Sequence, residues 1–274
     1  MRRTAAAGAP GRPLPPVAKV LPPLALGVFL LGIWEFLVWY WSVPKFVLPA
    51  PSAIAAAFAQ DHATLFASSW ITLKITVLAF LIALLAGVAL ATLFAQSEIV
   101  EMSLFPYAVV LQVTPIVSIA PLILIWVGLD HIERALLILA TIVAFFPILS
   151  NMTLGLKSVD HNLHNLFDLY GASRWQRLRD LQFPSALPHL LGGMRISGGL
   201  ALIGAVVAEF VAGSGTGTGL AWRIVESANR LNIPGMFAAL LLLSVLGIAV
   251  FLVLTAVQTL ALRRWHESAL KREN

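Results

Sequence analysis

Two acidic residues inside long apolar stretches are the first candidates for chemistry in this sequence. Glu35 lies in the first apolar stretch, and Glu209 lies near the end of a later one. An acidic side chain at the bilayer centre costs about 2.5 to 3.5 kcal/mol, so each is expected to face water, a partner or a transport pathway. A membrane-embedded enzyme would need a converging nucleophile, acid or metal, and two scattered carboxylates do not supply one.

Two further polar segments could suggest a metal site or a phosphate site. The cluster of Asp130, His131 and Glu133 fits no metal-binding spacing, and we interpret it as a solvated loop. Residues 213–219, GSGTGTG, are followed by no Lys-Ser or Lys-Thr and preceded by no buried strand, as a phosphate-binding loop requires. We predict a flexible turn there, followed by a short helix over residues 220–230. The sequence thus predicts no catalytic residue, no metal and no cofactor.

Composition identifies the class of protein. The chain has 274 residues, of which 59% are hydrophobic and 11% charged, so it is too apolar for a soluble domain and is predicted to be an all-α, polytopic membrane protein. The net charge of +5 could suggest nucleic-acid binding, but the basic residues lie mostly at the chain ends and in one loop. No nucleic-acid partner is therefore expected. The lack of cysteine excludes a disulfide framework and thiol chemistry.

Six apolar runs are long enough to cross a bilayer, which takes about 20 residues. Residues 1–19, rich in Pro, Ala and Arg, are expected to be a disordered cytoplasmic tail. The first run ends in Trp39, Tyr40 and Trp41, an interfacial pattern that favours a retained span over a cleaved signal peptide. A short helix is predicted after Ser52. The predicted spans cover about residues 20–41, 70–95, 102–127, 135–156, 189–212 and 231–262.

The third run is broken by Pro106, Pro115 and Pro121. Irregular backbone at membrane depth is tolerated only where protein or a water-filled cavity satisfies it, so this span should face the interior of the assembly. Ordinary hydrogen bonding between helices is the alternative role for its polar residues. The candidate pathway-lining residues are Gln112, Thr114, Pro115, Ser118 and Glu209.

The fifth run contains many small residues, which let helix backbones approach closely in lipid. Glu209, near the end of this run, is expected at the outer mouth of the pathway, where water, substrate or an arginine can meet it. We favour a pair with Arg223 or Arg230 that reversibly holds a gate shut. The small residues of the run are Gly192, Gly193, Ser197, Gly198, Gly199 and Gly204.

Residues 162–188 form a polar island between the fourth and fifth spans. Apolar side chains at helical spacing predict a first short helix, which Gly171 should end in the left-handed conformation. Ser173 and Gln176 have the spacing of a capping box and start a second helix, which Pro184 should stop. The large apolar side chains of the island need a partner surface. An amphipathic helix lying on the membrane is the alternative.

The island resembles the cytoplasmic EAA loop of ATP-binding-cassette (ABC) importer permeases, on which their ATPase subunits dock. The spacing from Gly171 through nine residues to Leu181, followed by Phe183 and Pro184, carries the resemblance. The acidic residue of the family motif is missing. Three other segments, residues 48–52, 115–128 and 145–151, are similar to the same family. The ATPase-coupling residues that the resemblance implies are Asn165, Leu166, Phe167, Tyr170, Gly171, Ala172, Leu181, Phe183 and Pro184.

The resemblance covers about residues 30–262 and implies a MetI-like ABC permease fold with six transmembrane helices in the bacterial inner membrane. Within that family the chain is similar to the nitrate, sulfonate and taurine permeases. This similarity implies a permease homodimer, two copies of a separate ATPase and an external solute-binding protein. The chain has no Walker A sequence of its own, so ATP hydrolysis would belong to that partner and the chain is expected not to be an enzyme. We expect a small organic substrate, such as a sulfonate or a heterocyclic vitamin precursor, because the candidate pathway has no central Lys or Arg to favour a small inorganic anion.

An ion-coupled secondary transporter is the alternative function. Such a protein would show broken helices in both halves, and only the first half has a proline-broken span. The orientation follows from the basic residues: residues 1–19, 157–188 and 263–274 hold four Lys or Arg each, and the opposite loops hold four in total. By the positive-inside rule both termini and the loop over 157–188 are cytoplasmic, on either side of a permease domain over 20–262.

Overall fold

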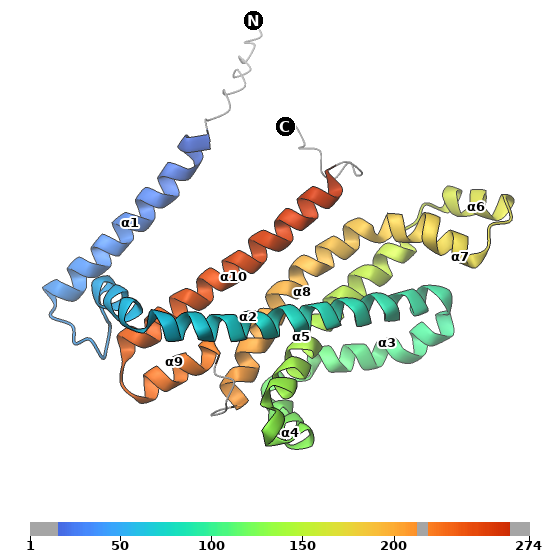
Figure 1. The fold of residues 1–274 in the computed structure, drawn as a ribbon. Coiled ribbons are helices and arrows are strands. Elements are labelled where there is room, and N and C mark those ends of the chain that lie inside the picture. The colour runs from blue at the N-terminus through green and yellow to red at the C-terminus, as the bar shows by residue number, and fades with distance from the viewer. Residues whose placement is uncertain (1–15, 213–218, 264–274) are drawn as a thin grey trace, which may run out of the picture.

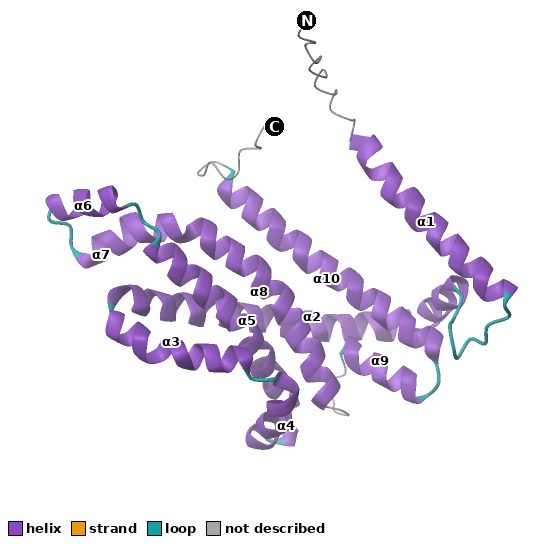
Figure 2. Cartoon of the chain, turned by 180° about the vertical axis from the view of Figure 1, so that it is seen from behind, coloured by secondary structure: helices purple, strands orange, loops and turns teal. Residues whose placement is uncertain are grey.

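The structure is a computed structural model of the chain, and it describes residues 16–212 and 219–263. All regular structure in these residues is helical (Figures 1 and 2). Residues 1–15 and 264–274 of the predicted tails, and the predicted turn over 213–218, lie outside the described residues. The helices are α1 (Pro16–Tyr40), α2 (Pro51–Gln96), α3 (Glu98–Val113), α4 (Ile116–Val127), α5 (Ile132–Lys157), α6 (His161–Leu169), α7 (Arg174–Arg177), α8 (Phe183–Ala212), α9 (Leu220–Asn229) and α10 (Ile233–Leu262), with a 3-10 turn η1 (Leu129–His131) before α5 and a π-helical turn η2 (Leu178–Gln182) before α8.

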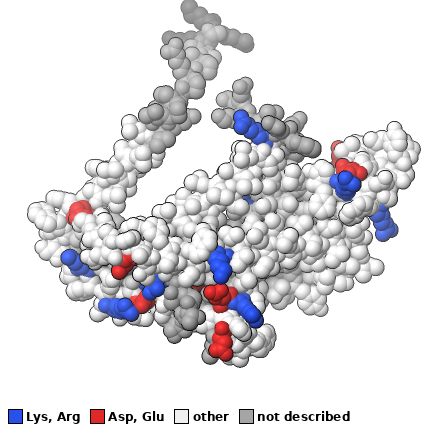
Figure 3. Space-filling view, in the orientation of Figure 1, with Lys and Arg blue, Asp and Glu red and all other residues white. Residues whose placement is uncertain are grey.

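Among the described residues, five helices are long and apolar enough to cross a membrane: α1, α2, α5, α10, and α8 together with α7 and η2 before it. A sixth span forms if α3 and α4 are taken as one, and this pair bends by 102° at its break. In Figure 3 the charged side chains of this face lie along its left and lower edges and at the upper right, and a broad uncharged surface lies between them, as expected of a surface that meets lipid. The all-α, six-span prediction is confirmed, with the third span sharply bent.

Two helix boundaries differ from the prediction. α1 begins at Pro16, so the described end of the predicted tail is helical. α2 is one continuous helix of 46 residues and joins the predicted short helix after Ser52 to the second span. Residues 52–70 contain no Gly or Pro and are rich in Ala, so nothing interrupts the helix there. At about 1.5 Å per residue α2 is roughly 69 Å long, so part of it projects beyond a hydrocarbon core of about 30 Å.

The centre of the bundle is the contact between α5 and α8, with α2 packed along both. Small residues line this contact, as predicted for the fifth span: a Cβ on Gly204 would lie 2.9 Å from the Cα of Ala140. Ser197 is fully buried and donates a hydrogen bond to the Ala144 carbonyl on α5. Gly192, by contrast, faces open space within this chain. The close contact of α5 and α8 therefore depends on one face of α8.

α1 stands apart from most of the bundle (Figure 1). It meets the other helices near its C-terminal end, where the Trp34 and Phe237 rings lie 6.1 Å apart, and most of its apolar side chains are exposed within this chain. Residues 158–182, which hold α6, α7 and η2, are called the α6–α7 hairpin below. In Figures 1 and 2 the N-terminal end of α1, the C-terminal end of α10 and this hairpin lie toward one side of the bundle.

Candidate functional site

The α6–α7 hairpin has the local structure that the sequence predicts. The chain leaves α6 through Gly171, whose φ of +65° is the left-handed conformation that a residue without a Cβ adopts readily. Ser173 and Gln176 form the predicted capping box, in which the Ser173 hydroxyl accepts from the Gln176 amide at 3.3 Å and Gln176 Oε1 accepts from the Ser173 amide at 2.8 Å. Arg177 donates to the Asp168 carboxylate at 2.6 Å and so joins α7 to α6. These contacts hold the two short helices in one arrangement.

A groove of about 370 Å³ lies between α6 and α7. Tyr170 is 82% exposed and Leu166 is 45% exposed, so two large apolar side chains border the groove and remain accessible. Large apolar side chains so exposed on a polar element indicate an interaction surface. Five of the nine predicted coupling residues line the groove: Leu166, Phe167, Tyr170, Gly171 and Ala172.

The other four predicted coupling residues divide into two pairs. Asn165 and Pro184 are exposed. Leu181 is 6% exposed, and Phe183 packs against a buried cluster that contains Leu178. Leu181 and Phe183 therefore fix the hairpin to the transmembrane helices, and the buried Leu181 presents no surface to a partner.

The prediction that Pro184 stops the second short helix is wrong. Pro184 is the second residue of α8, and the helix continues from η2 without a break. A proline inside a helix has no N–H for the carbonyl four residues earlier, and its ring clashes with that carbonyl. In the π-helical turn η2 the Phe183 amide donates to the Leu178 carbonyl, five residues before it. The helix is thus wider directly before Pro184, where the ring needs room.

The predicted pathway residues of the third span surround a sharp break between α3 and α4. At this break the Thr114 hydroxyl donates to the Val110 carbonyl at 2.6 Å. Gln112, Pro115 and Ser118 are exposed on the surface of this chain, and Thr114 is half-buried. Polar groups and non-helical backbone at membrane depth need protein or water around them, so this surface is unsuited to lipid.

Glu209 is buried and caps a helix. Its side chain is 2% exposed. One carboxylate oxygen accepts from the Thr72 hydroxyl on α2 at 2.8 Å, and the other accepts from the Ala221 amide in the first turn of α9 at 2.9 Å. The Thr72 hydroxyl in turn accepts from the Leu220 amide at 2.9 Å. Glu209 and Thr72 together satisfy amides at the start of α9, and the carboxylate meets the positive end of that helix.

Two expectations for Glu209 are therefore wrong. Its carboxylate is not open to a pathway in this structure, because side chains and backbone of the same chain enclose it. The two arginines expected to pair with it bond Glu226, Arg223 at 2.6 Å and Arg230 at 2.9 Å. A helix N-terminus takes the place of the expected arginine. Gly219 permits the arrangement, since a Cβ there would overlap the Glu209 carboxylate.

Glu35, the other acid within an apolar span, also caps the start of a helix. Its carboxylate accepts from the Ser52 amide at 3.0 Å and from the Ser52 hydroxyl at 2.7 Å. Ser52 lies in the first turn of α2, where backbone amides have no partner within the helix. Both acids that stand in apolar spans thus cap the N-terminus of another helix.

Arg195 is a charged membrane residue that the sequence analysis overlooks. It lies near the middle of α8, about 18 Å from Phe183 at the α-helical rise. Its guanidinium carbon is 4.5 Å from the ring centroid of Phe251 on α10, a cation–π contact, and its side chain is exposed within this chain. The signal was available, because Arg195 is the one Lys or Arg in the fifth apolar run. The charged residues at membrane depth are therefore not limited to the two acids.

Known proteins of similar sequence are named as permease proteins of transport systems. The family model described as "Binding-protein-dependent transport system inner membrane component" matches residues 79–265. The riboflavin transport system permease protein RibX of Chloroflexus aurantiacus is 33% identical over 243 residues, 88% of each chain. The formylaminopyrimidine transport permease protein ThiX of Halalkalibacterium halodurans is 30% identical over 245 residues, 89% of this chain and 96% of that protein.

The fold has a counterpart among solved structures. A crystal structure of an amino acid ABC transporter superposes on 76% of this chain and 97% of that chain with a TM-score of 0.62, at 17% sequence identity. At that identity the likeness shows the fold alone, and it confirms the predicted MetI-like ABC permease fold. The family match and the sequence relatives show that the chain belongs to the binding-protein-dependent transport system inner membrane components, the multi-pass permease subunits of ABC importers.

Proposed function

We propose that this permease couples to a separate ATPase through the groove of the α6–α7 hairpin and moves a small organic solute, delivered by an external binding protein, across the inner membrane. The observation that carries the proposal is the groove itself. Five of the predicted coupling residues line it, and one of them, Tyr170, is exposed and therefore accessible to a partner. At the other end of the hairpin, Leu181 and Phe183 are packed into the bundle, and η2 continues into α8. A partner that moves the hairpin would therefore move α8 with it.

The proposed substrate is a heterocyclic organic compound. The two relatives with the highest identities given above are named for riboflavin and formylaminopyrimidine, which are both nitrogen heterocycles. A sulfonate is the second candidate, because a 29% identical relative from Bacillus subtilis is named as a putative aliphatic sulfonates transport permease. The external binding protein would supply most of the selectivity.

We propose a second copy of this chain as the partner in the membrane, with one ATPase bound to each copy. Gln112, Pro115 and Ser118 are exposed at the α3–α4 break, where lipid is an unsuitable neighbour. Two copies that face each other at this break would enclose a polar passage between them. Among the described residues, α3 and α4 are the one helix pair bent in this way, which does not favour the paired broken helices of a secondary transporter.

The test is reconstitution of the permease with its ATPase after a change in the groove. Tyr170→Asp places a charge among the apolar groove residues and should abolish co-purification of the ATPase while the permease still inserts. Leu169→Asp is the matched control, because Leu169 is 84% exposed on the same helix end and does not line the groove. Retained ATPase binding by Tyr170→Asp would refute docking at this groove.

A further inference from the structure

A second pocket lies where the α6–α7 hairpin meets the C-terminal end of α2. It has a volume of about 290 Å³. Five of its six lining residues are polar, none is a carboxylate, and none lines the groove between α6 and α7. The pocket is therefore a separate, basic site on the hairpin. Its lining residues are Ala95, Gln96, His164, Arg174, Arg177 and Gln182.

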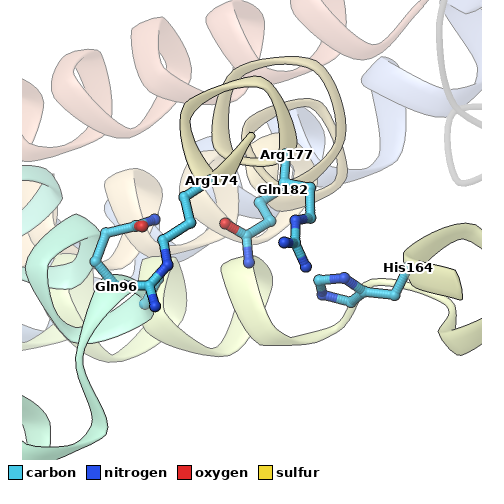
Figure 4. A pocket seen from close by; sticks show the side chains of 6 residues that line it. Gln96, His164, Arg174, Arg177 and Gln182 are labelled. Atoms are coloured by element: carbon cyan, nitrogen blue, oxygen red, sulfur yellow. The ribbon is translucent and has the colours of Figure 1, made fainter. Parts of the chain in front are cut away.

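The polar side chains converge from different elements. Figure 4 shows Arg174 beside Gln96, the last residue of α2, and Arg177 pointing toward the ring of His164, with Gln182 between the two arginines. Arg174 and Arg177 are three residues apart in α7, so they lie on one face of that helix. The capping box at the start of α7 and the anchored turn η2 hold that face toward α2.

The positive charge of the pocket is only partly compensated. Arg177 bonds Asp168 at 2.6 Å, but a guanidinium has five N–H donors, so others remain for a ligand. Within the described residues, the hairpin's ion pairs are Arg177 with Asp168 and Arg179 with Asp180. Arg174 is not part of either pair. The pocket thus offers two guanidinium groups, two side-chain amides and an imidazole, and among the described residues the one carboxylate ion-paired to its lining is that of Asp168.

We propose that this pocket binds a phosphate group, carried by an anionic phospholipid headgroup or by a free phosphate compound. Guanidinium groups bind phosphate oxygens through paired, charge-assisted hydrogen bonds, and the side-chain amides add neutral donors. The pocket begins at Ala95 and Gln96, where the apolar span of α2 ends, which is the depth of lipid headgroups. This placement rests on the proposed orientation, in which the hairpin faces the leaflet that is rich in anionic lipid. A bound phosphate group would join α2 to the hairpin on which the ATPase is proposed to dock.

The experiment measures binding to the purified full-length permease in neutral detergent, without its ATPase. The probes are dioctanoyl phosphatidylglycerol, dioctanoylglycerol with the same chains and no phosphate, and inorganic phosphate, with bound ligand counted by native mass spectrometry. We expect phosphatidylglycerol to bind and dioctanoylglycerol not to bind. Arg174→Gln should weaken phosphatidylglycerol binding about tenfold, the usual effect of one charge-assisted hydrogen bond. Arg179→Gln, a change of the same kind outside the pocket, should leave binding unchanged.

The outcomes separate the two sources of phosphate. Competition by inorganic phosphate, lost in Arg174→Gln, would show that free phosphate compounds also occupy the pocket, whereas binding of the lipid without competition would assign it to the headgroup. Equal binding of dioctanoylglycerol, or equal affinities in the Arg174→Gln and Arg179→Gln variants, would overturn the proposal. If Arg174→Gln does not fold, Gln96→Leu tests the same pocket without a change of charge. Because no ATPase is present, these results are independent of the docking test on Tyr170.

Discussion

The Glu209 carboxylate on α8 accepts a hydrogen bond from the Thr72 hydroxyl on α2 at 2.8 Å, across 137 positions of the sequence. Both residues are buried, and they lie at the start of α9, where they bind the Leu220 and Ala221 amides. A position expected to carry a gating ion pair is therefore a helix cap that fixes α9 to two spans. Its loss should release α9 rather than remove a contact to substrate.

Glu209→Gln keeps the shape of the side chain and removes one acceptor oxygen. The carboxylate serves the Thr72 hydroxyl with one oxygen and the Ala221 amide with the other, so a carboxamide leaves one buried donor without an acceptor. The cost of such a group is about 1–3 kcal/mol. We expect a lower melting temperature, faster hydrogen exchange in α9 and reduced transport, while the subunits still assemble. A variant with wild-type stability, exchange and transport would contradict this role.

A second change in the same hydrogen-bond network tests whether Glu209 and Thr72 act together. Thr72→Val removes the hydroxyl that links Glu209 to the Leu220 amide, so its effect and that of Glu209→Gln should not add. Thr92→Val, also on α2, removes a hydroxyl that bonds only the preceding turn at 2.7 Å and should change stability little. Fully additive effects of the Thr72 and Glu209 changes would show that the two residues act separately.

Gly219 should tolerate no side chain, because a Cβ at this position would overlap the Glu209 carboxylate. Gly219→Ala is therefore expected to displace the start of α9 and to lower both the melting temperature and transport. Gly219 is the N-cap of α9, a position at which glycine is also preferred to alanine. Gly192→Ala is the matched control, since an added Cβ there meets open space within this chain and favours the helix by about 1 kcal/mol. Equal melting temperatures for the two variants would argue against a close contact at Gly219.

Turns and helix caps that involve residues close together in the sequence could be predicted from the sequence alone. Gly171 and the capping box of Ser173 and Gln176 involve positions a few residues apart, so turn and cap rules predict them correctly. The partners of Glu209 come from α2 and α9, which only the packing of α8 brings together, so the sequence located the acid but not its role. The helix continues through Pro184 because a π-helical turn precedes it, and turn and cap rules include no sequence signature for such a turn.

The orientation of the permease remains a prediction from its Lys and Arg residues, and reporter fusions test it. Cytoplasmic loops carry an excess of basic residues, so fusions at residues 170 and 274 should report the inside, and fusions at residues 60 and 225 the outside. Residue 60 lies in the N-terminal part of α2, ahead of its uncharged stretch over residues 75–95. An outside signal at residue 170 would exclude an ATPase at the hairpin, whatever the shape of the groove.

Replacement of Gly171 by valine should separate insertion of the permease from its coupling to the ATPase. The φ of +65° costs a residue with a Cβ roughly 1–2 kcal/mol, and a β-branched residue more. An added Cβ meets nothing within 4 Å, so the strain comes from the backbone alone and changes the angle between α6 and α7. If this strain is relieved only when the hairpin rearranges, ATPase affinity should fall by at least about 5- to 30-fold, and transport should fall with it.

Gly171→Asn is the matched variant, because asparagine enters the left-handed region far more readily than valine and adds a side chain at the same place. It should retain most of the ATPase binding, measured by co-purification and by substrate-stimulated ATP hydrolysis in the reconstituted complex. Insertion of both variants should equal that of the wild type, since Gly171 lies outside the helices that are long and apolar enough to cross a membrane. If valine and asparagine reduce binding equally, the groove rejects any side chain at this position and the backbone conformation is not the cause. If neither reduces it, the ATPase does not depend on the angle that Gly171 sets.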